Sequence, residues 1–176
     1  MKTLTVFALV CAMAALTGAA AVPEEKADED QTADINLAKR TFCSTRRCSR
    51  GWTRYNGRCF RFVPRPMTWA AAEKNCMFMG GHLASIHNIL EYLRLLSLMS
   101  SSRVYKKTWI GGTDAQEEKQ WFWSDGTPFN YVKWCRGEPN NSFGKQHCLD
   151  MNHEGYKCWD DLQCNRRSPS ICAKNI

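Results

Sequence analysis

The stretch Cys158-Trp159-Asp160-Asp161-Leu162-Gln163-Cys164 combines two cysteines, a large aromatic residue and two adjacent carboxylates. A strand-like run covers 157–159, a second lies around Cys148-Leu149, and a third spans 170–173. Apolar runs this short, bounded by turn residues, favour strands over helices. We therefore predict that the C-terminal part of the chain forms short antiparallel strands in a cysteine-rich region.

Two helices are predicted before this region. Thr68 is a suitable cap for a helix whose apolar residues recur at helical spacing, and Gly80-Gly81 should end it. A second helix is expected to begin near Asn88, because Glu91 follows three positions later as in a capping box. The serines of 100–102 should end this second helix.

A strand and a long loop complete the prediction. Residues 59–63 alternate between apolar and polar types after the turn residues Asn56-Gly57, and Pro64 is expected to end that strand. About forty residues after Trp109-Ile110 are rich in glycine, proline and aromatic residues and lack helical periodicity. An aromatic-rich segment of this kind is expected to be an ordered loop and not a linker. The predicted fold class is therefore α+β.

The first forty residues are typical of processing signals. Lys2 is followed by an apolar stretch and then by small residues up to Ala21, which predicts a secretory signal peptide over 1–21. Residues 22–40 are acidic and end at Lys39-Arg40, so they form either a propeptide or a flexible tail. The folded domain is then 41–176, which carries 20 Lys and Arg against 11 Asp and Glu, a net of +9.

The chain has ten cysteines, which is too many for a typical cytosolic protein. Nine remain after the signal peptide, so a disulfide framework is expected, with one cysteine that is free or paired between molecules. Composition alone leaves the pairing open. No Cys-x2-Cys spacing is present, and cysteine-bound zinc is not expected.

The order of these landmarks resembles the C-type lectin-like domain over residues 43–176. The matching positions, in chain order, are Trp52, Gly57, Cys59, Trp69, Cys76, Leu83-Ala84-Ser85-Ile86, Trp109-Ile110-Gly111-Gly112, Glu138-Pro139-Asn140, Cys148, Trp159-Asp160-Asp161, Cys164 and Cys172. No single motif is decisive, but their order and spacing are specific. Within the family, the chain is most similar to small secreted fish lectins and type II ice-structuring proteins.

The resemblance selects one set of disulfides. It implies the pairs Cys48–Cys59, Cys76–Cys172, Cys135–Cys158 and Cys148–Cys164. Cys43 is then left over, and a disulfide-linked homodimer through Cys43 is one hypothesis, a capped or free thiol the other.

The resemblance also implies a calcium site that binds carbohydrate. The positions that would bind both the ion and the sugar are Glu138, Asn140, Gln146, Asp160 and Asp161. Gln146 stands where the family has a second Glu, and Asp160 stands where Asn is usual. The set nevertheless keeps three carboxylates and two amides, which suit calcium. The Glu-Pro-Asn order implies a mannose-type sugar.

An auxiliary calcium site of some relatives maps onto Asp114, Glu118, Asn141, Gln146 and His147. Only the first two residues are acidic, so this site is expected to be weak or absent.

Two other functions remain as alternatives. Ice binding is disfavoured because the loop Asn141-Ser142-Phe143-Gly144-Lys145 lacks threonine and contains a charged residue. A calcium-independent binder of anionic surfaces is suggested by an arginine cluster, which consists of Arg46, Arg47, Arg50, Arg54, Arg58, Arg61 and Arg65. The other interpretation of that cluster is a solvated basic face.

The remaining classes are not expected. No nucleophile elbow, zinc-binding helix or phosphate loop accompanies the histidines, so no enzymatic activity is predicted. Nothing after the signal peptide is long and apolar enough to span a membrane. A nucleic-acid partner is improbable for a secreted chain. The sequence thus predicts a secreted lectin with glycans as partners.

Overall fold

The computed structural model describes residues 47–102, 106–153 and 157–176. The expected signal peptide, the acidic segment 22–40, Cys43 and Arg46 lie outside the described residues. Contacts divide the chain into two units, Met1–Arg40 and Thr41–Ile176. All elements described below belong to the second unit.

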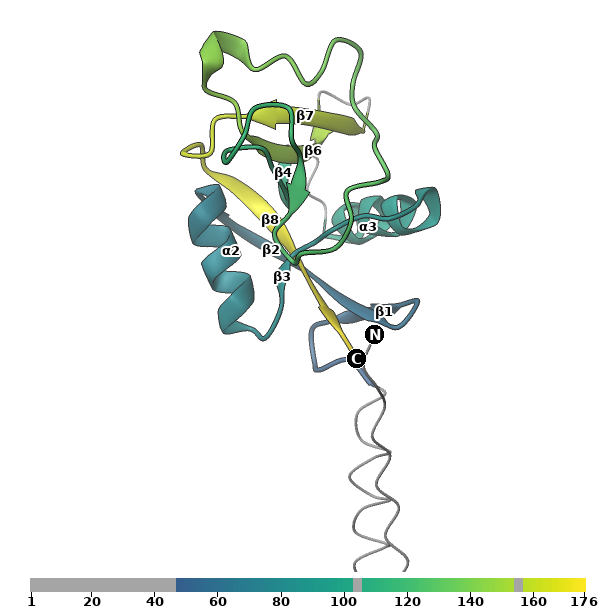
Figure 1. Ribbon diagram of the computed structural model, residues 1–176. Helices are drawn as coiled ribbons and strands as arrows, with labels where there is room; N and C mark the ends of the chain where they lie inside the picture. Colours follow the sequence, from purple (N-terminus) through teal and green to yellow (C-terminus); the bar gives the residue numbers. More distant parts are fainter. Residues whose placement is uncertain (1–46, 103–105, 154–156) are drawn as a thin grey trace, which may run out of the picture. The chain divides into compact units, whose positions relative to one another are not determined.

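The described part of the second unit consists of one twisted sheet, two α-helices and a 3-10 helix (Figure 1). The elements are β1 (Thr53–Tyr55), β2 (Arg58–Met67), α2 (Trp69–Phe78), β3 (His82–Leu83), α3 (Ile89–Ser101), β4 (Thr108–Thr113), β5 (Phe122–Trp123), the 3-10 helix η2 (Ser142–Gly144), β6 (Cys148–His153), β7 (Cys158–Leu162) and β8 (Ser168–Asn175). The strand order is β1-β2-β8-β4-β6-β7, with β3 paired to β8 and β5 to β4. Among the residues described, no helix has the length and apolar composition needed to cross a bilayer.

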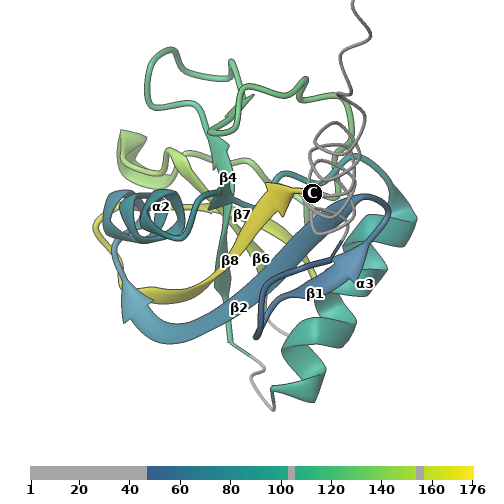
Figure 2. The ribbon, with the colours of Figure 1, turned by 90° about the horizontal axis from the view of Figure 1, so that it is seen from below.

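Two helices, a sheet and a long loop confirm the α+β prediction, with one difference in strand direction. Six of the strand pairs are antiparallel, whereas β4 and β8 meet in parallel at Trp109 and Ser170. Both views place α2 and α3 on opposite sides of the β2–β8 pair (Figures 1 and 2).

Both helices begin at the residues that the sequence predicts. The Thr68 side chain accepts a hydrogen bond from the Ala71 N–H of α2 at 3.4 Å. The Asn88 side chain accepts one from the Glu91 N–H of α3 at 2.9 Å. These bonds satisfy amide groups that have no partner inside the helix.

The prediction that Pro64 ends the strand expected over 59–63 is wrong, because β2 continues to Met67. β2 pairs regularly with β8 from Arg58 to Val63, and the register then shifts before β2 pairs again at Met67. Pro64 lies inside this irregular stretch. A proline that lacks an N–H is tolerated at such a shift, because the regular ladder is already interrupted there.

Two apolar clusters form the core. The first contains Trp159 and the buried apolar side chains of α3, and the second contains Trp109 and the buried side chains of α2. A Cβ atom on Gly112 would lie 2.7 Å from the Leu149 side chain, so close packing between β4 and β6 requires glycine there.

Among the residues that the structure describes, four disulfides hold this framework, and they are the pairs that the family resemblance implies. They join Cys48–Cys59, Cys76–Cys172, Cys135–Cys158 and Cys148–Cys164.

The long loop is attached to β7 by its backbone as well as by the Cys135–Cys158 disulfide. The Cys135 N–H donates to the Trp159 carbonyl at 2.9 Å, and the Trp159 N–H donates to the Lys133 carbonyl at 2.8 Å. Five rings surround Trp159: Tyr92, Trp123, Phe129, Tyr131 and Trp134. The loop is therefore an ordered part of the core. Its attachment to β7 positions the part of the loop that follows Cys135.

Candidate metal centre

Three carboxylates converge where the long loop meets β7. Glu138 comes from the loop, and Asp160 and Asp161 come from β7. One oxygen from each lies within 4.8 Å of the other two. Both aspartates are buried, whereas Glu138 is half-buried. Tertiary structure thus brings together residues that are more than twenty positions apart.

Asp161 holds the loop backbone. Its carboxylate accepts hydrogen bonds from the Asn140 N–H at 3.0 Å and from the Asn141 N–H at 2.7 Å. Asn140 in turn donates from its amide to Glu138 at 2.9 Å. The Glu138–Pro139 peptide bond is cis. Glu138, Asn140 and Asp161 therefore form one connected unit.

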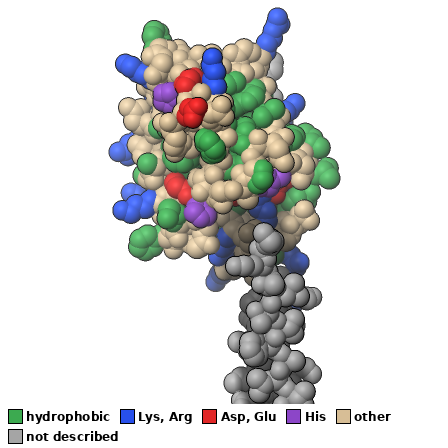
Figure 3. All heavy atoms as spheres, in the orientation of Figure 1, with side chains coloured by type: hydrophobic (Ala, Val, Ile, Leu, Met, Phe, Trp, Pro, Cys, Tyr) green, Lys and Arg blue, Asp and Glu red, His purple; other side chains and the backbone are tan. Residues whose placement is uncertain are grey.

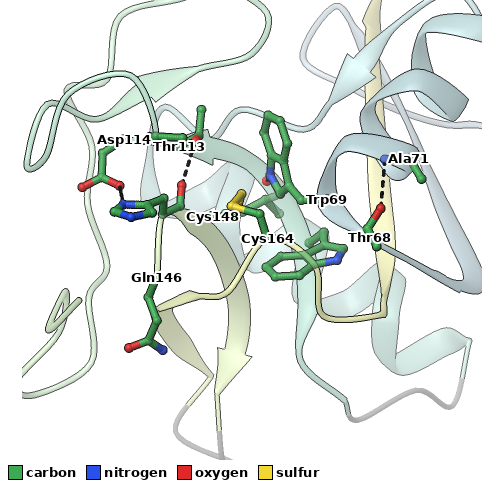
Figure 4. Close-up of a disulfide and its surroundings, with 12 residues drawn as sticks. Thr68, Trp69, Ala71, Thr113, Asp114, Gln146, Cys148 and Cys164 are labelled. Atoms are coloured by element: carbon green, nitrogen blue, oxygen red, sulfur yellow. Dashed lines mark hydrogen bonds and ion pairs between the residues drawn. A yellow bond between two sulfur atoms is a disulfide. The ribbon is translucent and has the colours of Figure 1, made fainter. Parts of the chain in front are cut away.

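Gln146 lies beside this unit but uses its amide on the backbone. Its NH2 group donates to the Asp161 carbonyl at 2.7 Å, and its oxygen accepts from the Ser142 N–H at 2.5 Å. Figure 4 shows its side chain pointing away from the disulfide Cys148–Cys164. Gln146 thus supports the backbone of the loop and of β7.

Burial and neighbouring negative charge shift the pKa of Glu138. Burial raises the pKa of Glu138 to about 7, and a hydrogen bond to Asp161 and the charges of Asp160 and Asp161 act in the same direction. A bound cation would stabilise the charged form of all three groups. Carboxylate and amide oxygens are the ligands that calcium prefers, so the residues present fit this ion.

Two charged residues at this cluster were not identified from the sequence. Lys107 donates from its ammonium group to Asp160 at 2.6 Å, although the two residues are 53 positions apart in the sequence. Asp150 pairs with Asp160 across β6 and β7 and is fully buried. Neither carboxylate oxygen of Asp150 has a hydrogen-bond partner among the described residues. Burial raises the pKa of Asp150 well above its usual value, although Lys107 opposes this effect. In the sequence, Asp150 could have been noticed as an acidic residue inside the apolar run 148–151.

A second cluster contains Asp114, Glu118 and His147. One ligand atom from each lies within 4.8 Å of the others. Asn141 contacts this cluster by donating from its amide to Glu118 at 2.5 Å. Four of the five auxiliary positions are therefore together, whereas the Gln146 amide is bonded elsewhere.

The arginine cluster does not form one uniform surface. Arg58 donates to Glu91 at 2.7 Å and to the Ser85 hydroxyl at 2.8 Å, and only 13% of its side chain is exposed. Figure 3 shows Lys and Arg side chains spread over one face of the molecule. The exposed members of the cluster among the described residues are Arg47, Arg50, Arg54, Arg61 and Arg65.

Comparison with known proteins gives a family match. Residues 65–174 match the model of the Lectin C-type domain. Ladderlectin of Oncorhynchus mykiss is 37% identical over 100% of this chain and 96% of its own. Galactose-specific lectin nattectin of Thalassophryne nattereri is 42% identical over 76% of this chain and 84% of its own. A type-2 ice-structuring protein of Brachyopsis segaliensis is 40% identical over 97% of this chain and 98% of its own.

Solved structures agree with the sequence match. Herring type II antifreeze protein superposes with a TM-score of 0.69 at 40% identity, covering 73% of this chain and 99% of that one. A calcium-independent type II antifreeze protein gives a TM-score of 0.67 at 42% identity, with 73% and 95% covered.

Proposed function

The chain belongs to the Lectin C-type domain family, and from this premise we propose that it is a secreted lectin that binds glycans through calcium at the long loop. The family consists of binding proteins and not of enzymes. The observation that carries the proposal is the convergence of Glu138, Asp160 and Asp161 within 4.8 Å. The proposed site also includes Asn140, which bonds to Glu138, and Gln146, whose amide oxygen would bind the ion in place of the Ser142 N–H.

When bound, calcium would supply direct coordination of two neighbouring sugar hydroxyls. Glu138 would accept a hydrogen bond from one hydroxyl, while the Asn140 amide would donate to the other. Asp161 would keep both residues in place through its bonds to the loop backbone. The Glu-Pro-Asn order favours mannose, fucose or N-acetylglucosamine. Recognition of microbial glycans in innate defence is the proposed role, inferred from the family resemblance.

Affinity chromatography tests this proposal. The purified chain is applied to mannose-agarose and galactose-agarose with calcium and is then eluted with EDTA. We expect calcium-dependent retention on mannose, and we expect the variant Asp161→Asn to lose it, because one ion ligand and the loop anchor weaken together. Glu117→Gln is the matched control, since Glu117 is exposed and lies outside the cluster.

Retention on galactose alone would overturn the sugar assignment and agree with the names of two relatives, the galactose-specific nattectin and a lactose-binding lectin of Anguilla japonica. No calcium-dependent retention on either resin would overturn the site itself. Thermal hysteresis would then be measured, because ice-structuring relatives cover nearly the whole chain. The exposed side chains of Phe143 and Lys145 beside the loop argue against a flat ice-binding face.

A further inference from the structure

Two segments converge at the end of β4 and bring Asp114, Glu118 and His147 together. Asp114 follows β4 directly, Glu118 lies in the turn after it, and His147 precedes β6. Asp114 and His147 lie 33 positions apart in the sequence. Figure 4 shows a dashed line from Asp114 to an imidazole ring, which is the contact with His147.

Two distances between ligand atoms match the edge of a metal coordination tetrahedron, and the third pair of atoms, from Asp114 and Glu118, lies within 4.8 Å. The His147 Nδ1 atom lies 3.2 Å from an Asp114 oxygen and 3.5 Å from a Glu118 oxygen. Zinc binds nitrogen and oxygen at about 2.0–2.2 Å, so neighbouring ligand atoms of a tetrahedral site lie about 3.3 Å apart. An ion can therefore be placed between these three atoms without a large rearrangement.

Hydrogen bonds around the cluster orient the Asp114 carboxylate and hold the backbone of His147. The second Asp114 oxygen accepts from the Lys119 N–H at 2.9 Å, which directs the first oxygen toward His147. The His147 carbonyl accepts from the Thr113 hydroxyl at 2.7 Å and from the Asp114 N–H at 3.2 Å. Outer contacts of this kind hold metal ligands in position in known sites.

The exposed fraction differs among the three side chains, and this difference leaves access for an ion. The Asp114 side chain is 3% exposed, that of His147 is 30% exposed and that of Glu118 is 42% exposed. The buried carboxylate thus forms the floor, and the other two ligands border solvent. A water molecule can occupy the fourth position.

The donor set separates this cluster from a calcium site. Calcium takes six to eight oxygen ligands, and an imidazole nitrogen is a poor member of such a set. Imidazole with carboxylates suits zinc and neighbouring transition metals. We propose that Asp114, Glu118 and His147 bind a divalent transition-metal ion of the zinc class, independently of the proposed calcium site. The ion would cross-link the turn 115–119 to the segment that enters β6.

Cobalt and zinc titrations of the purified full chain, prepared without a polyhistidine tag, test this proposal. With calcium saturating, we expect cobalt to give the strong visible absorption of a tetrahedral site, zinc to abolish it, and zinc to raise the melting temperature. Loss of an outer contact weakens metal affinity by about 10–100-fold, so His147→Gln, which removes a direct ligand, should weaken zinc by more than about 100-fold.

Three further variants make the result unambiguous. His82→Gln removes an imidazole that contacts only Glu73 among the described carboxylates, and it should bind zinc as the parent chain does. His147→Asp supplies oxygen alone and should lose the preference for zinc over calcium. Asp161→Asn should keep zinc binding, which separates this site from the proposed sugar site. Absence of a tetrahedral cobalt spectrum, or equal zinc affinity in His147→Gln, would overturn the proposal.

Discussion

Arg58 illustrates how the surroundings of one residue decide its role. By sequence it belongs to a run of arginines that suggests an exposed basic surface. In the fold its guanidinium contacts Glu91 at 2.7 Å, the Ser85 carbonyl at 3.1 Å and Asp125 at 3.7 Å. Ser85 also donates from its hydroxyl to Asp125. This network joins β2, the segment before α3 and the start of the long loop, so Arg58 stabilises the fold.

Asp125 should make the free energy of unfolding depend on pH in the acidic range. Burial alone would raise its pKa, but hydrogen bonds from Ser85 and Thr127 and the charge of Arg58 outweigh burial and lower the pKa below 3.8. An acid with a lowered pKa stabilises the fold above its unfolded pKa, and this stabilisation is lost as pH falls through the folded value. The free energy of unfolding should therefore decrease below about pH 3.8.

The variant Asp125→Asn tests this through urea unfolding at several pH values. It should be less stable than the parent at neutral pH, and its stability should fall less steeply in acid. Glu117→Gln changes an exposed carboxylate and serves as the control. Parallel acid curves for Asp125→Asn and the parent would contradict the role of Asp125.

Local contacts determine where the helices begin, whereas nonlocal contacts determine where a strand ends. The caps at Thr68 and Asn88 each act on an amide three positions away, which a sequence pattern can reveal. Pro64 suggested a strand end by composition, but β8 continues beside β2 beyond it. The extent of a strand depends on its partner, and the partner is about one hundred residues away in the sequence.

Asn88→Ala should destabilise the protein by about 0.5–2 kcal/mol, because the Glu91 N–H then loses its capping partner. Equilibrium denaturation with urea measures the change. Asn88→Asp keeps an oxygen acceptor at the cap and should be close to the parent. An alanine variant as stable as the parent would show that the cap contributes nothing measurable to α3.

Across the whole molecule, distant segments are joined by disulfides and by the packing around Trp159. Cys76–Cys172 links α2 to β8 with a sequence separation of 96. Cys135–Cys158 attaches the long loop to β7, next to the residues proposed to bind calcium. The loop is therefore positioned by the core, although it has little regular structure of its own.

Replacing Cys135 and Cys158 together by serine should lower the free energy of unfolding by about 2–4 kcal/mol. The loop should also become more sensitive to proteases between residues 124 and 147, because one of its attachments to β7 is removed. Limited proteolysis with mass spectrometry locates the cuts. Replacing Cys48 and Cys59 by serine is the matched control, since that disulfide closes the β1–β2 hairpin. Equal loop cleavage in both double variants would contradict this role for Cys135–Cys158.

Much of the fold and part of the candidate site follow from the sequence itself. Caps, glycines and apolar spacing identify both helices, and the order of the landmarks from Trp52 to Cys172 indicates the family and the disulfide pairs. Glu138, Asp160 and Asp161 could be selected because each stands in a short motif. These features are readable because each depends on residues a few positions apart or on a pattern shared with a family.

Tertiary structure alone decided the remaining features. The Lys107–Asp160 ion pair, the burial of Asp150 and the burial of Arg58 all depend on strand register and loop closure. Such contacts join residues tens of positions apart, and no local pattern encodes the distance between them. Sequence therefore identified which residue types were available, and the packing of the sheet determined which of them meet.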